Sequence, residues 1–569
     1  MSDWMVGAAR REIRFPGYGF GMMGYGRATQ VIRGHATPLY SRAFCIADGA
    51  DGAPLFFAQS EICMIFPELK RAVLKRLGES HPGLFSEERL MLTASHTHSA
   101  PGGFSHFPFY NFSIPGFRPK VFDGIVRSLY EALTRAHERR QPATLHFTHG
   151  DFAEESGVAF NRSLAAYNRN PGVTPLPDTQ THLALERTMW LLHARTPDGR
   201  AIGQINWFGV HPTSLGNTGH LVSYDNKGYA AEYLEKAMGP GTVAIFAQQF
   251  AGDVSPNAQG SSRKDWRRGP YRDETANAQF NGRLQSDQAA ALLATLGEQH
   301  RLRPGATDAA LVRRDLSSVE VDSAYTGGVA GEKTSAPCHG LPFFRGSPVD
   351  GPGAPAPVIA LLRTLALAAR RAELKHAKRA GGAVLEAVLA KQRAQQPKLI
   401  VSEAAEGTLL GLRSTLRLPA FLDPILKEVQ RQERAGALAE KPWVPSVLPL
   451  QYFRLGELAL IGFPGEITTV AGRELRELCA TVLAPAGVRQ VVISSYANSY
   501  FGYCTTYHEY QAQLYEGGHT TFGNRTHDAF RTEYARFLGE CLKPAAERRL
   551  ESASEHRFSP ELLALRSVA

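Results

Sequence analysis

Two histidines stand two residues apart in the segment TASHTHSAPGG, residues 93–103. The segment overlaps the apolar run LMLTA, which predicts a strand, and alternate side chains of an extended strand share one face. His96 and His98 are therefore expected to point the same way, just before a Pro-Gly-Gly turn. Two neighbouring imidazoles suit a metal ligand and a proton carrier, although a hydrogen-bonded structural pair has the same spacing.

Two further candidate ligands follow other apolar runs. His211 lies in NWFGVHPTS, and Glu466 follows the run LALIGF in the turn PGE. Enzymes of the α/β class assemble their sites at strand ends, where loops converge over a rigid sheet. Two imidazoles and a carboxylate match a catalytic zinc shell that leaves one position for water. Spacing alone does not establish such a set, since an isolated histidine or glutamate is more often structural.

Four more segments have residue types that are common in functional sites. FAGDVSPNAQG carries Ser255 in a polar turn that lacks the G-x-S-x-G setting of a hydrolase nucleophile. Arg162 lies in FNRSLAAYNRNP, where the alternative is an ordinary surface arginine. The aromatic run FSHFPFYNF, residues 104–112, either lines a channel or packs in the core. Residues 497–518 are rich in tyrosines, which at this density line a pocket or an interface: Tyr500, Tyr503, Tyr507, Tyr510 and Tyr515.

The elements that must position these residues alternate between short apolar runs and helical patterns. We expect strands at 42–47, 54–59, 89–94, 144–148, 188–194 and 201–208, and a second strand-rich stretch that covers 450–462 and 490–495. We expect helices at 66–77, 122–136, 228–238, 278–296, 470–483 and 527–542. The pattern predicts an α/β fold with a mixed β-sheet core flanked by helices, in a single large catalytic domain with a helical insertion.

The expected insertion covers residues from about 325 to 445. Pro and Gly crowd Ser335–Pro357, which predicts a long loop, and residues 358–395 predict two helices separated at Gly381–Gly382. We expect an amphipathic pair packed on the core. The alternative is a lid or a membrane-contacting element whose basic side chains face lipid headgroups: Arg370, Arg371, Lys375, Lys378 and Arg379.

Bulk composition excludes several classes of protein. The 569 residues are 43% hydrophobic and 21% charged, which is ordinary globular composition. The net charge of +9 is scattered along the chain, so nucleic-acid binding is not expected. Six dispersed cysteines without a C-x-x-C pair predict buried thiols. Because neither a signal peptide nor a membrane-spanning run is visible, we expect a cytoplasmic protein or export by an unrecognised route.

Taken together, these segments resemble the neutral (non-lysosomal) ceramidase family. The resemblance covers most of residues 5 to 525, and its motifs follow one another in the family's order. They are MMGYG at 22–26, SHTHSAPGG at 95–103, NRSLAAYNRNP at 161–171, NWFGVHPTS at 206–214, DNKGY at 225–229, GDVSPN at 252–257, PW at 442–443, PGEITTVAGREL at 464–475 and YEGG at 515–518.

The resemblance implies a zinc-dependent hydrolase that splits N-acylsphingosine (ceramide) into a fatty acid and a sphingoid base. It implies one Zn²⁺ per chain, held by His96, His211, Glu466 and Tyr503. It also implies that His98 lies near the scissile amide, that Arg162 and Tyr515 bind the amide and stabilise its charge, and that Ser255 is needed as a nucleophile or a hydrogen-bond donor. The expected partners are a lipid substrate and a peripheral membrane surface.

Departures from the family pattern concern the chain's end and the substrate. About 50 residues follow YEGG, so we expect a catalytic domain over 1–545, a tail over 546–569 and no C-terminal β-sandwich domain. Ala100 and the segment GGHTTFG, residues 517–523, differ from the family's usual residues. Two alternatives therefore stand beside ceramide hydrolysis. One is an amidase for another N-acyl lipid, such as an N-acyl amino acid or a bacterial sphingolipid, and the other is a non-catalytic lipid-binding homologue.

Overall fold

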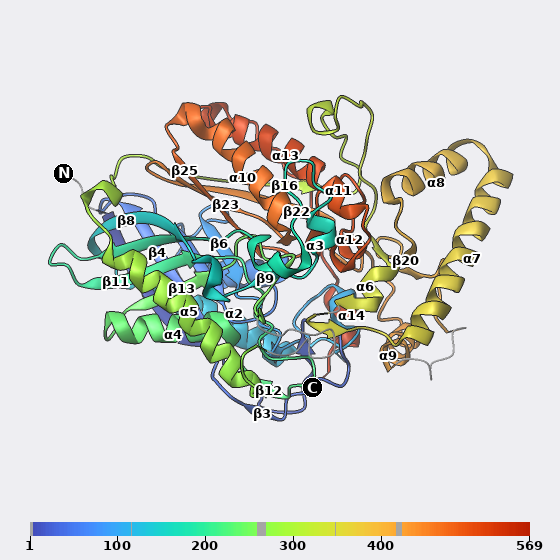
Figure 1. Cartoon of the computed structure of the whole chain (residues 1–569), viewed down its shortest axis with the longest axis horizontal. Helices are drawn as coiled ribbons and strands as arrows, with labels where there is room; N and C mark the ends of the chain where they lie inside the picture. The colour runs from blue at the N-terminus through green and yellow to red at the C-terminus, as the bar shows by residue number, and fades with distance from the viewer. Residues whose placement is uncertain (1–3, 115, 259–268, 348, 417–423, 569) are drawn as a thin grey trace.

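Two β-sheets form the centre of the molecule, with helices over the outer face of each (Figure 1). The computed structural model describes residues 4–114, 116–258, 269–347, 349–416 and 424–568. The larger sheet runs in the order β13 (Val243–Ala247), β11 (Ala201–Trp207), β10 (Thr188–Arg195), β8 (Gln141–Asp151), β1 (Trp4–Glu12), β4 (Tyr40–Asp48), β5 (Leu55–Ser60) and β6 (Leu90–Ala94), with β15 (Arg301–Leu302) beside β8. The smaller runs β16 (Thr307–Asp315), β22 (Val447–Leu455), β23 (Leu458–Gly462) and β25 (Gln490–Ser494).

The inner faces of the two sheets share one apolar cluster. Val6 and Phe57 of the larger sheet belong to the same buried cluster as Leu460 and Val492 of the smaller. Because alternate residues of a strand face opposite sides, the neighbours of these residues face outward toward helices. The layers are therefore helix, sheet, sheet and helix, and the predicted α/β class in a single large domain is confirmed.

Helices complete the core on both outer faces. The larger sheet packs against α1 (Pro67–Ser80), α2 (Pro119–Glu138), α4 (Asp225–Met238) and α5 (Glu274–Ala294). The smaller sheet packs against α10 (Thr469–Leu483) and α13 (Thr526–Cys541). In α2, Ile125, Leu129 and Leu133 recur at helical spacing and are fully buried, which explains how this segment covers β1 and β4.

Three parallel strand pairs carry the segments that form the site. β5 pairs with β6, β11 with β13 and β23 with β25 in parallel, whereas the other pairs along the two sheets are antiparallel. Short elements lie in the connections and at the ends of these strands: β2 (Met22–Met23), β3 (Gly34–His35), β7 (Ala100–Pro101), β9 (Phe160–Asn161), α3 (Leu164–Tyr167), β12 (Leu221–Val222), β14 (Val254–Ser255), β24 (Glu466–Ile467), β26 (Tyr503–Cys504), α11 (Tyr507–Tyr510) and α12 (Tyr515–His519).

The segment from 325 to 445 differs from the expectation in one respect. The predicted loop at Ser335–Pro357 contains β17 (Cys338–Gly340), α6 (Leu341–Arg345), β18 (Gly346–Ser347) and β19 (Gly351–Pro352). The two predicted helices are present as α7 (Ala356–Ala380) and α8 (Gly382–Gln395), separated at the expected glycines. β20 (Ile400–Glu403), β21 (Thr408–Leu409) and α9 (Pro424–Arg434) complete the segment.

The α7–α8 hairpin projects from the rest of the molecule (Figure 1). Three side chains of α7 and two of α8 are buried, so the expected packing on the core is limited to a narrow contact. At the chain's end, α14 (Pro560–Arg566) packs back on the domain, where Arg566 Nη1 donates to the His106 carbonyl at 2.6 Å. No helix within the described residues is long and apolar enough to cross a bilayer.

Candidate active site

Four predicted metal ligands meet at one buried point between the sheets. The Nε2 atom of His96 lies 3.3 Å from Glu466 Oε1, and His211 Nε2 lies 2.9 Å from Glu466 Oε2. The Tyr503 hydroxyl is 3.2 Å from His211 Nε2. Each of the four residues is no more than 2% exposed. Side chains from positions that span residues 96 to 503 thus form a single cluster of nitrogen and oxygen donors.

The backbone of each ligand leaves the carboxyl end of a strand. His96 follows β6, His211 follows β11, and Glu466 and Tyr503 lie on β24 and β26 after β23 and β25. β24 and β26 pair in parallel with Glu466 directly opposite Tyr503. This register brings the carboxylate and the phenol into one site, because directly opposite side chains on adjacent strands project to the same face.

The predicted strand geometry of the histidine pair is wrong. β6 ends at Ala94, and His96 has a φ of 76°, in the left-handed region that costs a non-glycine residue about 1–2 kcal/mol. The turn aims the two imidazoles at each other, with His98 Nε2 3.0 Å from His96 Nε2. A Cβ on Gly24 of the MMGYG segment would lie 2.4 Å from the His98 ring, so this approach requires glycine.

Backbone carbonyls orient the two ligand imidazoles. His96 Nδ1 lies 2.7 Å from the Cys63 carbonyl oxygen, and His211 Nδ1 lies 3.1 Å from that of Val254. Since a carbonyl only accepts, each Nδ1 is assigned as the donor, which leaves Nε2 with a free electron pair facing Glu466. Histidines that bind metals show this arrangement, in which the second nitrogen donates to a carbonyl. The donor set therefore fits a tetrahedral zinc shell.

The Glu466 carboxylate is held ionised by its neighbours. Tyr496 donates to Oε2 at 3.1 Å, and Tyr500 donates to Oε1. Burial would raise the pKa of the carboxyl, but the nearby imidazoles and the Tyr500 hydroxyl hold the pKa of Glu466 well below its usual range. Burial lowers the pKa of His96 to about 4, so this imidazole is neutral at pH 7, as a metal ligand must be.

Arg162 links the metal cluster to a second set of polar groups. Its Nη2 donates to the Tyr503 hydroxyl at 3.0 Å and to the Gly252 carbonyl at 2.8 Å. Its Nε donates to Glu516 at 2.9 Å, and its Nη1 donates to Asp350 at 2.6 Å. A guanidinium offers five N–H groups, so four of them are committed within the protein. Arg162 is therefore rigidly placed beside the Tyr503 oxygen.

Ser255 is bound to a carboxylate. Its hydroxyl donates to Asp350 Oδ1 at 2.5 Å, and the Thr213 hydroxyl donates to the same oxygen at 3.0 Å. Burial would raise the pKa of Asp350, but the Arg162 guanidinium, His211 and the Ser255 hydroxyl hold it below its usual value. Ser255 is thus linked to Tyr503 through Asp350 and Arg162, and it contacts a carboxylate instead of an imidazole base.

Tyr515 lies at the edge of the cluster with its hydroxyl uncommitted. Its ring is 5.4 Å from the Tyr503 ring, and the Arg162 guanidinium lies 5.6 Å from its centre. Within the described residues, no side chain or backbone group hydrogen-bonds to the Tyr515 hydroxyl. A half-buried hydroxyl of this kind is available to donate to a bound molecule.

Sequence reasoning missed three side chains that complete the site. Asp350 lies in the Gly- and Pro-rich segment VDGPG, where an acidic residue before a turn was the available signal. Tyr496 has a φ of 57°, a backbone feature that the sequence does not reveal. Glu516, beside Tyr515 in YEGG, accepts from both Arg162 and Ser163. Each acts by holding a predicted residue in place.

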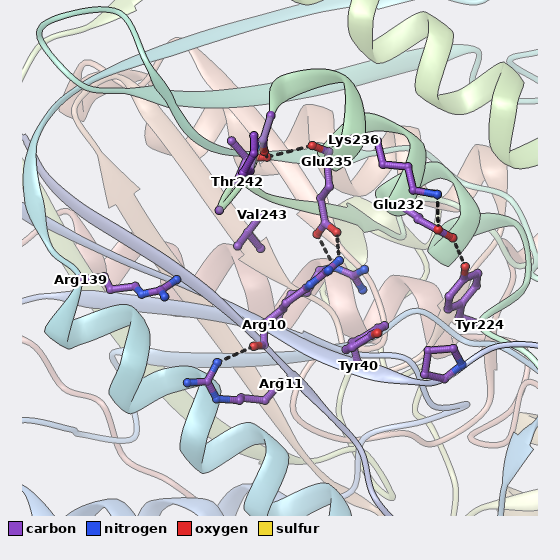
Figure 2. Close-up of a pocket in the computed structure, with 15 residues that line it drawn as sticks. Arg10, Arg11, Tyr40, Arg139, Tyr224, Glu232, Glu235, Lys236, Thr242 and Val243 are labelled. Carbon is purple, nitrogen blue, oxygen red and sulfur yellow. Dashed lines mark hydrogen bonds and ion pairs between the residues drawn. The ribbon is translucent and has the colours of Figure 1, made fainter.

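A cavity of about 630 Å³ lies elsewhere, between β1, β4 and the end of α4 (Figure 2). Glu235 faces the guanidinium of Arg10 there, and Glu232 accepts from both Tyr224 and Lys236. The cavity shares no lining residue with the metal cluster, and these carboxylates are already paired. We therefore place the candidate site at the cluster.

Comparison with known proteins gives matches over nearly the whole chain. The model of the family described as neutral/alkaline non-lysosomal ceramidase, N-terminal, matches residues 4–408 and 430–532. A neutral ceramidase of Pseudomonas aeruginosa is 32% identical over 535 residues, which cover 93% of this chain and 70% of the relative. A neutral ceramidase of Mycobacterium tuberculosis is 32% identical over 520 residues, which cover 88% of this chain and 71% of the relative.

Solved structures agree with the sequence matches. A structure titled as ceramidase complexed with C2 has a TM-score of 0.79 and 30% identity, covering 99% of this chain and 78% of that chain. The crystal structure of neutral ceramidase from Pseudomonas aeruginosa has a TM-score of 0.77 and 28% identity, covering 99% and 77%. From these matches, the chain belongs to the neutral/alkaline non-lysosomal ceramidase family.

Proposed function

We propose that this chain is a zinc-dependent amidase that hydrolyses N-acylsphingosine (ceramide) to a fatty acid and a sphingoid base. The observation that carries the proposal is the convergence of His96, His211 and Glu466, with both imidazoles presenting Nε2 to the carboxylate. The relatives that are similar to this chain are named neutral ceramidases, which supports ceramide as the substrate.

The three residues, with Tyr503, would hold one zinc ion. When bound there, zinc supplies Lewis acidity and activates water as a nucleophile near neutral pH. Burial and the Glu466 carboxylate raise the pKa of Tyr503 well above its usual value. Arg162 donates a hydrogen bond to the Tyr503 oxygen and opposes this shift, and a bound cation would lower the pKa of the phenol further.

Tyr515 and Arg162 have different parts in stabilising the amide. The Tyr515 hydroxyl is uncommitted, so it is the group positioned to donate to the carbonyl oxygen as negative charge develops there. Four of the N–H groups of Arg162 are already used, so we assign it mainly to orienting Tyr503 and the Tyr515 ring. A preorganised donor of the Tyr515 type contributes about 10²–10³ in rate.

His98 is the proton carrier in this scheme. Burial, with the neighbouring imidazoles, holds the pKa of His98 well below its usual value, so the ring is neutral at pH 7. A neutral imidazole accepts the proton that the attacking water releases and then donates it to the amine nitrogen as the C–N bond breaks. The Gly24 backbone and the Tyr25 ring, 4.6 Å from the imidazole, hold the ring in position for both transfers.

Ser255 serves as a hydrogen-bond donor in the proposed mechanism. Its proton is directed to Asp350, which also accepts from Arg162 and Thr213. The serine therefore fixes the carboxylate that holds Arg162. Activation of Ser255 as a nucleophile would require the same carboxylate to act as its base while paired with a guanidinium, which weakens its basicity.

Metal analysis of the purified protein, paired with hydrolysis of a fluorescent ceramide, tests the proposal. We expect about one zinc ion per chain. Chelation should abolish hydrolysis, and added zinc should restore it. An acyl amide without a sphingoid base, assayed in parallel, separates ceramide hydrolysis from amidase activity on another N-acyl lipid. Full activity in metal-free protein contradicts the zinc mechanism, and tight lipid binding without any turnover supports the non-catalytic alternative.

We also propose that the α7–α8 hairpin contacts an anionic membrane surface. Exposed basic side chains line α7, and Leu361, Val384 and Leu389 are each more than 40% exposed on the two helices. Such a combination suits lipid headgroups and the apolar layer beneath them. The basic side chains are Arg363, Arg370, Arg371, Lys375, Lys378 and Arg379.

Co-sedimentation with vesicles tests this contact. Reversing two charges, Arg370→Glu with Arg371→Glu, should reduce binding to vesicles that contain phosphatidylserine, because each basic residue near such a surface contributes about 1 kcal/mol. Arg200→Glu, in an exposed turn outside the hairpin, is the matched control and should bind as the wild type does. If the double variant of the hairpin binds these vesicles as well as Arg200→Glu does, the proposed membrane contact is wrong.

A further inference from the structure

Two buried histidines beside the site have no hydrogen-bond partner on either ring nitrogen. His339 on β17 is fully buried and His519 on α12 is 4% exposed. Within the described residues, neither ring nitrogen of either imidazole has a hydrogen-bond partner. A buried polar atom without a partner destabilises the folded protein, so such groups in native proteins call for a specific explanation.

His519 lies directly against the metal cluster. Its ring centre is 5.2 Å from that of Tyr503 and 6.2 Å from that of Tyr515. Gly502 precedes Tyr503 with a φ of 113°, and a Cβ there would lie 2.8 Å from the His519 ring. The backbone thus makes room for an imidazole beside the proposed ligand. A group that is hydrogen-bonded to the His519 ring would therefore lie beside Tyr503 and Tyr515.

His339 lies next to His519 in an aromatic wall. The two ring centres are 5.2 Å apart. His339 stacks on Phe109 at 4.0 Å, and Phe343 contacts His339 at 5.2 Å and His519 at 4.4 Å. Phe343 also stacks with Tyr515, at 6.0 Å. The histidines are therefore buried in a cluster of aromatic rings, where a hydrogen bond is strong because the local dielectric is low.

The two histidine segments are tied together by a buried lysine. Lys398 is 3% exposed, and its ammonium donates to the Cys338 carbonyl at 3.1 Å and to the Thr520 carbonyl at 2.6 Å. These two residues adjoin His339 and His519 in sequence. The Cys338 amide also donates to the Thr521 carbonyl at 2.9 Å. Both imidazoles are thus held by a rigid support, as a preorganised binding group requires.

We propose that His339 and His519 form a subsite that hydrogen-bonds a hydroxyl group of the substrate close to the scissile amide. This inference rests on the proposed amidase function and adds the residues that select the substrate. A neutral imidazole has one donor and one acceptor, and a hydroxyl group has the same pair, so the two are complementary. A carboxylate would only accept, and the nearby Lys398 ammonium is already directed at two carbonyls. The subsite therefore favours hydroxylated amides over N-acyl amino acids.

The ratio of kcat/KM between two substrates tests whether the subsite selects for hydroxyl groups. The two substrates are N-acylsphinganine and the matching N-acyl alkylamine that lacks both hydroxyl groups. We expect wild-type kcat/KM to favour the hydroxylated substrate by about 10-fold to 100-fold. The substrate without hydroxyl groups would leave the two buried imidazoles without hydrogen-bond partners. His519→Phe and His339→Phe keep an aromatic ring without the hydrogen bonds, and each should reduce this ratio at least fivefold. His519→Asn restores a donor and an acceptor, and should recover part of the ratio.

The preference ratio is independent of how much of a variant folds, since both substrates are assayed with the same preparation. His149→Phe is the matched control: this exposed histidine packs on Trp190 in the larger sheet, and its loss should leave the ratio unchanged. Hydrolysis of neither substrate by the wild type refutes the amidase function and the subsite with it. If the wild type hydrolyses both substrates with a kcat/KM ratio near one, the subsite alone is refuted. The same conclusion follows if the Phe variants lose kcat/KM equally on both substrates.

Discussion

Replacing Asp350 with asparagine tests the polar network that supports the site. The carboxylate accepts from Arg162 at 2.6 Å, from Ser255 at 2.5 Å and from Thr213 at 3.0 Å. Asparagine retains one acceptor and places an NH₂ group against a hydrogen-bond donor. Breaking a buried ion pair by removing one partner costs about 3–5 kcal/mol. Because Glu516 still pairs with Arg162, we expect Asp350→Asn to lower the free energy of unfolding by about 2–4 kcal/mol.

The same substitution should separate rate from metal binding. Asp350 does not contact the four proposed ligands except through Arg162, so zinc content should stay near that of the wild type. In the variant the Arg162 guanidinium would no longer hold Tyr503 and Tyr515 in position. A displacement of about 1 Å in such a site lowers kcat/KM by about 100-fold. Asp198→Asn, which alters an exposed ion pair with Arg200, is the matched control and should leave the free energy of unfolding close to that of the wild type.

The stability difference between wild type and Asp350→Asn should depend on pH. The folded-state pKa of Asp350 is lowered by Arg162, so its contribution is fully present above the unfolded pKa of about 3.9. The contribution is lost as the pH falls through the folded-state pKa. Urea unfolding at pH 7 and in acid therefore checks the sign. A variant with wild-type stability and kcat/KM at pH 7 would refute the reasoning.

Glu466→Gln should lose zinc and activity together, measured by metal analysis and ceramide hydrolysis, and retained zinc would contradict its assignment as a ligand. Tyr515→Phe should keep zinc and lower kcat by about 10²-fold or more, because it removes one donor, whereas an unchanged kcat would exclude that role. Chelation should lower Tm in the wild type but leave the Tm of Glu466→Gln unchanged. Lys70→Met should raise the free energy of unfolding more at pH 6 than at pH 10, since burial lowers the folded-state pKa of Lys70 to about 7 and its protonation favours the unfolded chain. An equal gain at both pH values would contradict that last prediction.

The sequence predicts most of the scaffold because apolar periodicity determines it. Strands expected at 144–148 and 201–208 lie within or overlap β8 and β11, and the break at Gly381–Gly382 separates α7 from α8. The prediction of a loop over Ser335–Pro357 is wrong, since this segment contains three strands. Each of these strands is only two or three residues long. Elements this short have no periodicity to detect, and their partners lie elsewhere in the chain, as with β17 and β20.

The ligand positions illustrate a different limit. Sequence reasoning expected His96 and His98 to share the face of a strand, and the structure brings them together through a turn with a positive φ instead. Tyr503 was assigned by resemblance alone, and its place opposite Glu466 depends on the register of two paired segments of two residues each. Register between short segments is set by tertiary contacts, which a single sequence does not encode locally.

Charge balance gives an independent physical reason for a divalent cation at this cluster. Glu466, Asp350 and Glu516 are buried carboxylates, and Arg162 is the guanidinium that pairs with the last two. Among these four side chains the net charge is thus −2, and Glu466 is the carboxylate that Arg162 does not pair with. An uncompensated buried charge costs several kcal/mol, so a cation of charge +2 held by His96, His211 and Glu466 would offset most of that cost. Asp350 comes from the segment that sequence analysis set apart as an insertion, and this balance becomes visible only when that segment is folded against the site.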